Sequence, residues 1–231
     1  MRRLPRRRHD GKQERTDHIR RAPVSEQHSP LAAAQPVFEE DQARADFYAL
    51  IARLFYAGPD ERLLAAISGA GEISGADEDA PLALSWRALG AAAAATDAQA
   101  ARDEYENVFV GTGKAEITLY ASHYLAESMQ ERVLVRLRDA LTAMGLAKNQ
   151  SAGEYEDHLA GLCEVMRHLI AAGSDDVAVQ KQKKFFIDYL NSWYANFCAA
   201  VIATPNTNFY KHVAAFTEAF LDLEAGSFEM I

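Results

Sequence analysis

Apolar residues recur at helical spacing along most of this chain, beginning near Glu39. The first apolar stripe consists of Phe47, Leu50, Ile51, Leu54 and Phe55. Residues three and four apart lie on one face of an α-helix, so this spacing predicts an amphipathic helix. Gly58-Pro59 ends that helix, and Asp60 is placed to cap a short second helix that reaches Ile67.

The same periodicity predicts further helices over residues 81–95, from about 97 to 109, and over 122–144, 155–171 and 175–203. In the last of these, apolar residues step by four, three, four and four: Phe186, Leu190, Trp193, Phe197 and Val201. The final stripe consists of Phe209, Val213, Phe216, Phe220 and Leu223. No segment alternates with period two for long enough to be a strand, and 117–120 is the nearest candidate. The pattern predicts an all-α fold, a single-domain bundle of about eight to ten helices.

Residues 1–38 lack this periodicity and are rich in Arg, Gln, Pro and His, which predicts a disordered basic tail before an all-helical domain over 39–231. The net charge of −9 is distributed unevenly. Nine Lys or Arg and three Asp or Glu give residues 1–21 a charge of +6, which leaves −15 for the rest of the chain. An acidic body attracts basic partners and repels nucleic acid. For the tail, contact with nucleic acid stays open beside a solvated terminus.

The sequence contains no run of the roughly 18 apolar residues that suggest a membrane span. Paired arginines occur near the start, but no apolar stretch follows them, so the start does not resemble a secretion signal. We therefore expect a cytoplasmic protein. Cys163 and Cys198 fall within predicted helices and match no metal-site spacing, so we expect two free, buried thiols.

Motifs of familiar enzyme classes are missing. A di-iron site in a helical bundle needs Glu-x-x-His on two helices, and none of the seven histidines has a Glu three positions before it. Zinc spacings, a Gly-x-Ser-x-Gly elbow and a complete phosphate-binding loop are also missing, because Ala115 follows the GTGK of 111–114. The sequence thus predicts a protein that is not an enzyme and needs no cofactor or metal.

Two segments could nevertheless form a binding site. Glu154, Glu156, Asp157 and His158 lie at the start of a predicted helix, where acids complement the helix dipole and Glu154 or Asp157 could cap the helix. Alternatively, these side chains converge at a groove edge and bind a basic group. The second segment is the irregular stretch from Tyr105 to Ser122, because long loops within a compact bundle are often functional. Its aromatic and apolar residues could line a peptide groove or fix the loop to the core.

Three sequence blocks follow one another here: YENVFVG at 105–111, LYAS at 119–122 and EYEDHLAGLCEVM at 154–166. Together they resemble the signature of the TorD/DmsD/NarJ family of molybdoenzyme maturation chaperones, and the resemblance extends over roughly residues 40–225. The chain departs from the family pattern at Thr112, Leu119 and Tyr155, which stand where the family has proline, and at Gly161, which stands for a glutamate. Since proline fixes φ, these loops are less constrained here.

The resemblance implies a chaperone that holds an apo-molybdoenzyme, through its twin-arginine leader, until the molybdopterin cofactor is inserted before export. The acidic body suits the leader's arginines, and an apolar groove suits its hydrophobic stretch. On this hypothesis Glu154, Asp157 and His158 hold the polar end of the leader. The apolar end would contact Tyr105, Val108, Leu119 and Tyr120. The full set of expected peptide-binding residues is Tyr105, Val108, Phe109, Leu119, Tyr120, Ser122, Glu154, Asp157 and His158.

Several alternatives stay open at this point. The client could be a formate dehydrogenase or a dimethyl-sulfoxide reductase, and the chaperone could bind the mature body of the enzyme instead of its leader. A nucleotide-binding regulatory role rests on Lys114 beside two glycines. Bundles with long connections can exchange elements, so both a monomer and a domain-swapped dimer are compatible with the sequence.

Overall fold

The computed structural model describes residues 39–73, 75, 77–125, 130–149 and 153–231. Within them, regular secondary structure is helical apart from one isolated β-bridge. This confirms the all-α class that the apolar periodicity predicts. The tail predicted to be disordered, residues 1–38, lies outside the described residues. No helix in the described part of the chain is both long and apolar enough to cross a membrane.

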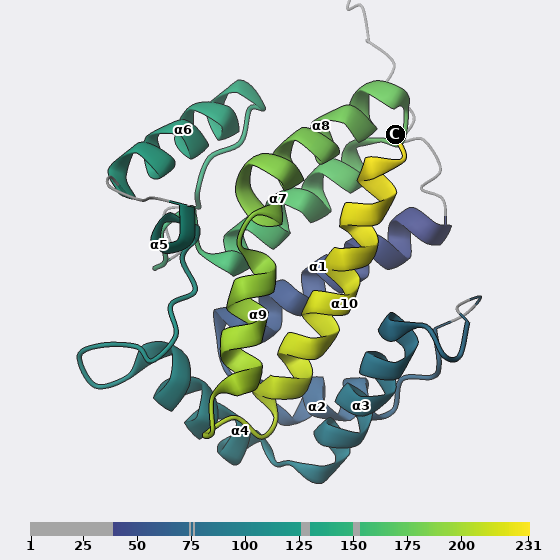
Figure 1. Cartoon of the computed structure of the whole chain (residues 1–231), viewed down its shortest axis with the longest axis vertical. Helices are drawn as coiled ribbons and strands as arrows, with labels where there is room; N and C mark the ends of the chain where they lie inside the picture. Colours follow the sequence, from purple (N-terminus) through teal and green to yellow (C-terminus); the bar gives the residue numbers. More distant parts are fainter. Residues whose placement is uncertain (1–38, 74, 76, 126–129, 150–152) are drawn as a thin grey trace, which may run out of the picture. The chain divides into compact units, whose positions relative to one another are not determined.

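The first described part contains α1 (Glu39–Tyr56), α2 (Glu61–Ser68), α3 (Pro81–Ala95) and α4 (Ala98–Tyr105) (Figure 1). A π-helical turn, η1 (Glu106–Val110), continues α4. The side chain of Asp60 accepts a hydrogen bond from the Leu63 backbone N–H at 2.7 Å, and Asp97 accepts one from Ala100 at 2.8 Å. Such caps satisfy N–H groups of the first turn that have no partner within the helix. The predicted cap at Asp60 is thereby confirmed, and Asp97 caps α4 in the same way.

The second part contains α5 (Ala121–Leu125), α6 (Gln130–Ala143), α7 (Leu159–Ala172), α8 (Asp176–Phe186), η2 (Ile187–Asn191), α9 (Tyr194–Ala203) and α10 (Tyr210–Glu229). The stretch 122–144, expected as one helix, carries α5 and α6, with 126–129 outside the described residues. The single helix predicted over 175–203 is wrong, because the chain leaves helical geometry at Trp193, whose φ is −136°. The indole N–H of Trp193 donates to the Tyr189 carbonyl at 2.6 Å and fixes this break.

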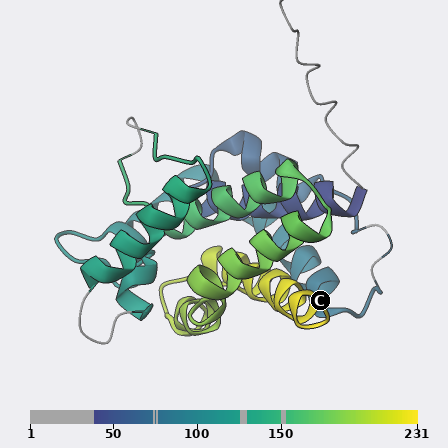
Figure 2. The same ribbon diagram turned by 90° about the horizontal axis from the view of Figure 1, so that it is seen from above.

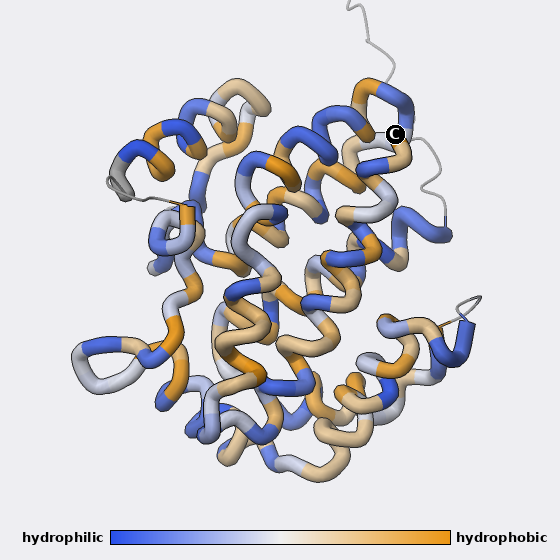
Figure 3. Tube along the Cα trace, in the orientation of Figure 1, coloured by the Kyte–Doolittle hydropathy of each residue, from blue (hydrophilic) through white to orange (hydrophobic). Residues whose placement is uncertain are grey.

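Within this helical unit, α1 packs mainly against α7 and also contacts α10, while α10 packs against α9 and α3 (Figures 1 and 2). Apolar and polar residues alternate around the turns of α8 and α10, as expected of amphipathic helices (Figure 3). The predicted stripe of Phe186, Leu190, Trp193, Phe197 and Val201 is at most 1% exposed, which confirms it. Cys163 and Cys198 are also buried and free, as predicted.

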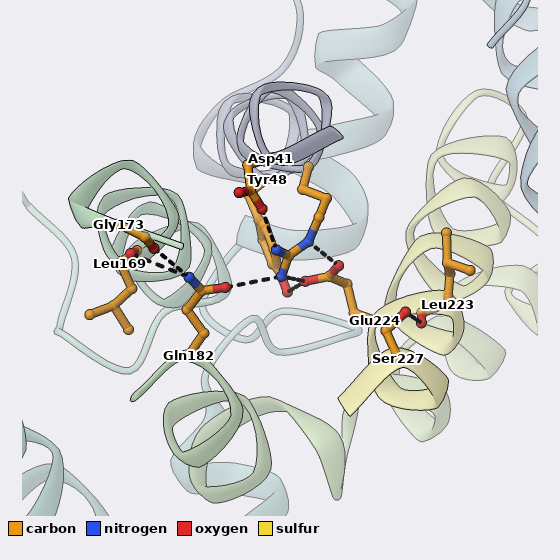
Figure 4. Close-up of polar contacts among 9 residues, drawn as sticks. Asp41, Tyr48, Leu169, Gly173, Gln182, Leu223, Glu224 and Ser227 are labelled. Atoms are coloured by element: carbon orange, nitrogen blue, oxygen red, sulfur yellow. Dashed lines mark hydrogen bonds and ion pairs between the residues drawn. The ribbon is translucent and has the colours of Figure 1, made fainter. Parts of the chain in front are cut away.

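A buried polar cluster joins α1, α8 and α10 (Figure 4). The carboxylate of Glu224, which is 2% exposed, accepts hydrogen bonds from Arg44 at 2.7 and 2.9 Å and from the Tyr48 hydroxyl at 3.0 Å. Arg44 also donates to Gln182 at 3.1 Å. The predicted apolar stripe of α10 is wrong at Leu223, which is 54% exposed, because Glu224 is the residue that turns inward to meet Arg44.

Candidate functional site

The two segments singled out in the sequence meet in the structure. Tyr120 and His158 form an antiparallel β-bridge. On its two sides, the Ala121 N–H donates to the Asp157 carbonyl at 2.9 Å, and the Leu159 N–H donates to the Leu119 carbonyl at 2.8 Å. Residues 36 to 40 positions apart are therefore held together, just before α5 and α7 begin.

Asp157 joins these segments through its side chain as well. One carboxylate oxygen, Oδ2, accepts a hydrogen bond from the Ser122 backbone N–H at 3.0 Å, so Asp157 caps α5 rather than its own helix. The side chain is almost completely buried, at 1% exposed. The second oxygen, Oδ1, has no hydrogen-bond partner among the described residues. A buried carboxylate oxygen without a donor is costly, so Oδ1 is the one polar side-chain atom of this segment left unsatisfied among the described residues.

His158 is the residue that caps α7, so the predicted caps at Glu154 or Asp157, and the predicted helix start near 155, are wrong. Its Nδ1 accepts a hydrogen bond from the Ala160 N–H at 3.2 Å. Burial lowers the pKa of the imidazole below its usual value, although the charges of Glu154 and Asp157 act in the opposite direction. The ring is therefore neutral at pH 7, which its role as an acceptor at Nδ1 requires.

Glu154, at the start of the 154–158 segment, also contacts Tyr120. Its half-buried carboxylate accepts a hydrogen bond from the Tyr120 hydroxyl. Burial and this contact with Glu154 raise the pKa of Tyr120 above its usual value, so the hydroxyl keeps its proton. Glu154 forms no ion pair among the described residues. Glu156, by contrast, accepts hydrogen bonds from Nε and Nη2 of Arg138 at 3.0 and 2.9 Å. Glu156 is thus paired with a cation among the described residues, whereas Glu154 is not.

The residues expected at the apolar end lie largely in the core. Val108, Phe109 and Leu119 are 0%, 6% and 4% exposed. Tyr105 is 7% exposed, and its hydroxyl donates to the Tyr56 carbonyl at the end of α1 at 3.0 Å. Burial raises the pKa of Tyr105 to about 12. In the free chain these side chains support the 118–122 segment rather than form a surface of their own.

The turn after η1 depends on Gly111. Its φ is +64°, and its N–H donates to the Glu106 carbonyl at 2.6 Å. A β-carbon at this position would overlap the Lys114 carbonyl, so only glycine fits. The Val108 carbonyl then accepts a hydrogen bond from the Ile117 N–H at 3.0 Å, which returns the chain towards Tyr120.

Sequence reasoning did not single out two exposed rings that border the site. Tyr56, the last residue of α1, is 50% exposed and lies 6.5 Å from the His158 ring, while Tyr155 is 60% exposed and lies 6.3 Å from the Tyr120 ring. Tyr120 and His158 are themselves 5.2 Å apart, so the four rings form a continuous row. The substitution of Tyr155 for the family's proline was a signal in the sequence, whereas Tyr56 becomes relevant only once α1 is placed beside α7.

The arrangement offers hydrogen-bond acceptors and aromatic faces. Among the described residues, no group of three His, Cys, Asp or Glu side chains is close enough to hold a metal ion. The carboxylates of Glu154 and Asp157 and the row of tyrosines favour a cationic, planar donor such as a guanidinium. The candidate site is defined here as Tyr56, Tyr120, Glu154, Asp157 and His158, with Tyr155 at its border.

Comparison with known proteins places the chain in a family. A family model described as nitrate reductase delta subunit matches residues 76–199, which include both segments of the site. A search of curated proteins finds no match. The match spans more than half of the chain and agrees with the resemblance carried by the three sequence blocks. The chain belongs to the nitrate reductase delta subunit family, whose members are molybdoenzyme maturation chaperones of the NarJ and TorD type.

Proposed function

We propose that this chaperone is cytoplasmic, is not an enzyme, and binds the twin-arginine leader of a molybdopterin oxidoreductase of the formate dehydrogenase or dimethyl-sulfoxide reductase type. It would hold the apo-enzyme until the cofactor is inserted and so delay export. Membership of the family supports a molybdoenzyme as the partner. The leader as the bound segment is supported by the chemistry of the site, since the leader contributes two adjacent arginines.

The observation that carries this proposal is the negative charge beside the aromatic row, where Glu154 forms no ion pair among the described residues. The negative charges of Glu154 and Asp157 act on the pKa values of both Tyr120 and His158. Glu106, which is exposed, adds to the negative potential at Tyr105. Carboxylates gathered in this way attract a basic ligand from a distance and pair with it on contact.

The buried residues of the expected site take part by positioning. Asp157 fixes the start of α5 through Ser122, and the Tyr105 hydroxyl fixes the end of α1. Val108, Phe109 and Leu119 anchor the intervening chain in the core. On this account the leader's arginines contact Glu154 and the tyrosines, and the buried residues fix the positions of these side chains.

The direct test is a calorimetric titration of the purified protein with a synthetic twin-arginine leader of a molybdoenzyme from the same organism. A leader with both arginines replaced by lysine serves as the control. We expect saturable binding that weakens with the lysine leader and with rising salt, because exposed charges are screened. If the protein binds the apo-enzyme body but none of the leaders, the proposed ligand is wrong and the body is the client surface.

A further inference from the structure

Tyr155 is an exposed ring directly beside Glu154, an acid that forms no ion pair within the part of the chain that the structure describes. The residue is 60% exposed, follows Glu154 in the chain, and lies with its centroid 6.3 Å from that of Tyr120 at an interplanar angle of 62°. The Tyr120 hydroxyl in turn donates to Glu154. Two ring faces and one carboxylate therefore border the same corner of the surface, which we call the 120/154/155 corner.

The Tyr155 ring already accepts a cation in the free protein. The ammonium group of Lys148 lies 5.8 Å from the Tyr155 centroid. A positive group over an aromatic face is attracted by the ring quadrupole, and this attraction is stronger when water is partly excluded. The face of Tyr155 is thus open to cations, and the resident one comes from a flexible side chain that a ligand can displace.

The charges around this corner favour a ligand cation over an internal one. Arg138 neutralises Glu156 and holds the pKa of that carboxyl below its usual value. Glu154 has no such partner among the described residues. The buried Oδ1 of Asp157, two residues after Tyr155, has no hydrogen-bond donor among them either. Glu154 therefore accepts a hydrogen bond from Tyr120 but has no ion-pair partner among the described residues, which favours a positively charged donor from outside the chain.

We propose that the 120/154/155 corner binds a guanidinium group of the leader and that Tyr155 is the residue by which the site prefers arginine to lysine. This inference rests on the proposed leader binding. The planar guanidinium can stack on Tyr155 while its N–H groups donate in a fork to Glu154. An ammonium group satisfies the charge of Glu154 but has no flat face to stack and no fork, so it gains less from the ring.

The test compares Tyr155→Leu with Tyr155→Phe, using the twin-arginine leader and its twin-lysine form in separate titrations. Tyr155→Phe keeps the ring and is expected to keep the ratio of the two affinities. Tyr155→Leu removes the ring and is expected to lower that ratio about fivefold, mostly by weakening the arginine leader. Because the side chain is largely exposed, both variants should fold as the unchanged protein does.

The outcomes separate this inference from the proposed function. If Tyr155→Leu weakens both leaders by the same factor, or leaves both affinities unchanged, Tyr155 does not set the preference for arginine and the inference is wrong, while leader binding stands. If the unchanged protein binds neither leader, leader binding and the inference both fail. A lowered arginine-to-lysine ratio in Tyr155→Leu, retained in Tyr155→Phe, supports the inference.

Discussion

Replacing Glu224 by alanine should destabilise the fold more than any exposed substitution on the same helix. Glu224 accepts three hydrogen bonds, two from Arg44 and one from Tyr48. Removing one partner of a buried ion pair costs about 3–5 kcal/mol, because the other charge stays desolvated. Asp41, 2.9 Å from Arg44, compensates part of that charge, but Tyr48 is 0% exposed and loses its acceptor. We therefore expect a loss of about 3–4 kcal/mol in the free energy of unfolding.

Urea denaturation followed by tryptophan fluorescence measures this loss, since Trp193 is 1% exposed and reports on the core. Glu229→Ala is the matched control, an exposed acid at the end of the same helix, and should change stability by less than about 0.5 kcal/mol. The double variant Arg44→Met, Glu224→Leu should lose less stability than Glu224→Ala alone, because it does not leave the Arg44 guanidinium desolvated without Glu224. A loss below about 1 kcal/mol for Glu224→Ala would refute the reasoning.

Two further predictions concern the segments that build the site. Gly111→Ala should lower the free energy of unfolding, measured by urea denaturation, by about 1–3 kcal/mol. Alanine would have to adopt a φ of +64°, and its β-carbon would overlap the Lys114 carbonyl. An unchanged urea midpoint would contradict this. The pKa of His158 is lower in the folded than in the unfolded protein, so its neutral form favours folding above the unfolded pKa, and this contribution is lost as the pH falls through the folded pKa. His158→Gln should therefore show a smaller loss of stability than the unchanged protein between pH 7 and pH 5, and equal losses would show that another group is responsible.

The helical frame follows from local information in the sequence. The cap residues Asp60 and Asp97 act within one turn of the helices that they begin, and apolar spacing needs no knowledge of distant residues. For the same reason the stripe from Phe186 to Val201 could be predicted although the helix itself is interrupted. The break at Trp193 depends on how one indole packs and bonds within the fold, and apolar spacing carries no such information.

The two segments that form the site could be predicted from the sequence, but the contact between them could not. The acidic block and the loop before Ser122 stand out locally, but only the bridge between Tyr120 and His158 brings them together. The roles of the residues also follow from the fold. Asp157 caps α5 rather than α7. The side chain of Leu119 is buried. Neither fact is encoded in a pattern along one segment.

The most direct test of leader binding replaces Glu154 by glutamine, which removes its charge while keeping its shape. Glu78→Gln, an exposed acid in the loop before α3, makes the same change of charge away from the site. By calorimetry at low salt, the account predicts that Glu154→Gln weakens the twin-arginine leader about tenfold, as expected for the loss of a charged hydrogen-bond acceptor, while Glu78→Gln has little effect. Equal affinities for both variants and the unchanged protein would contradict the claim that this site holds the arginines.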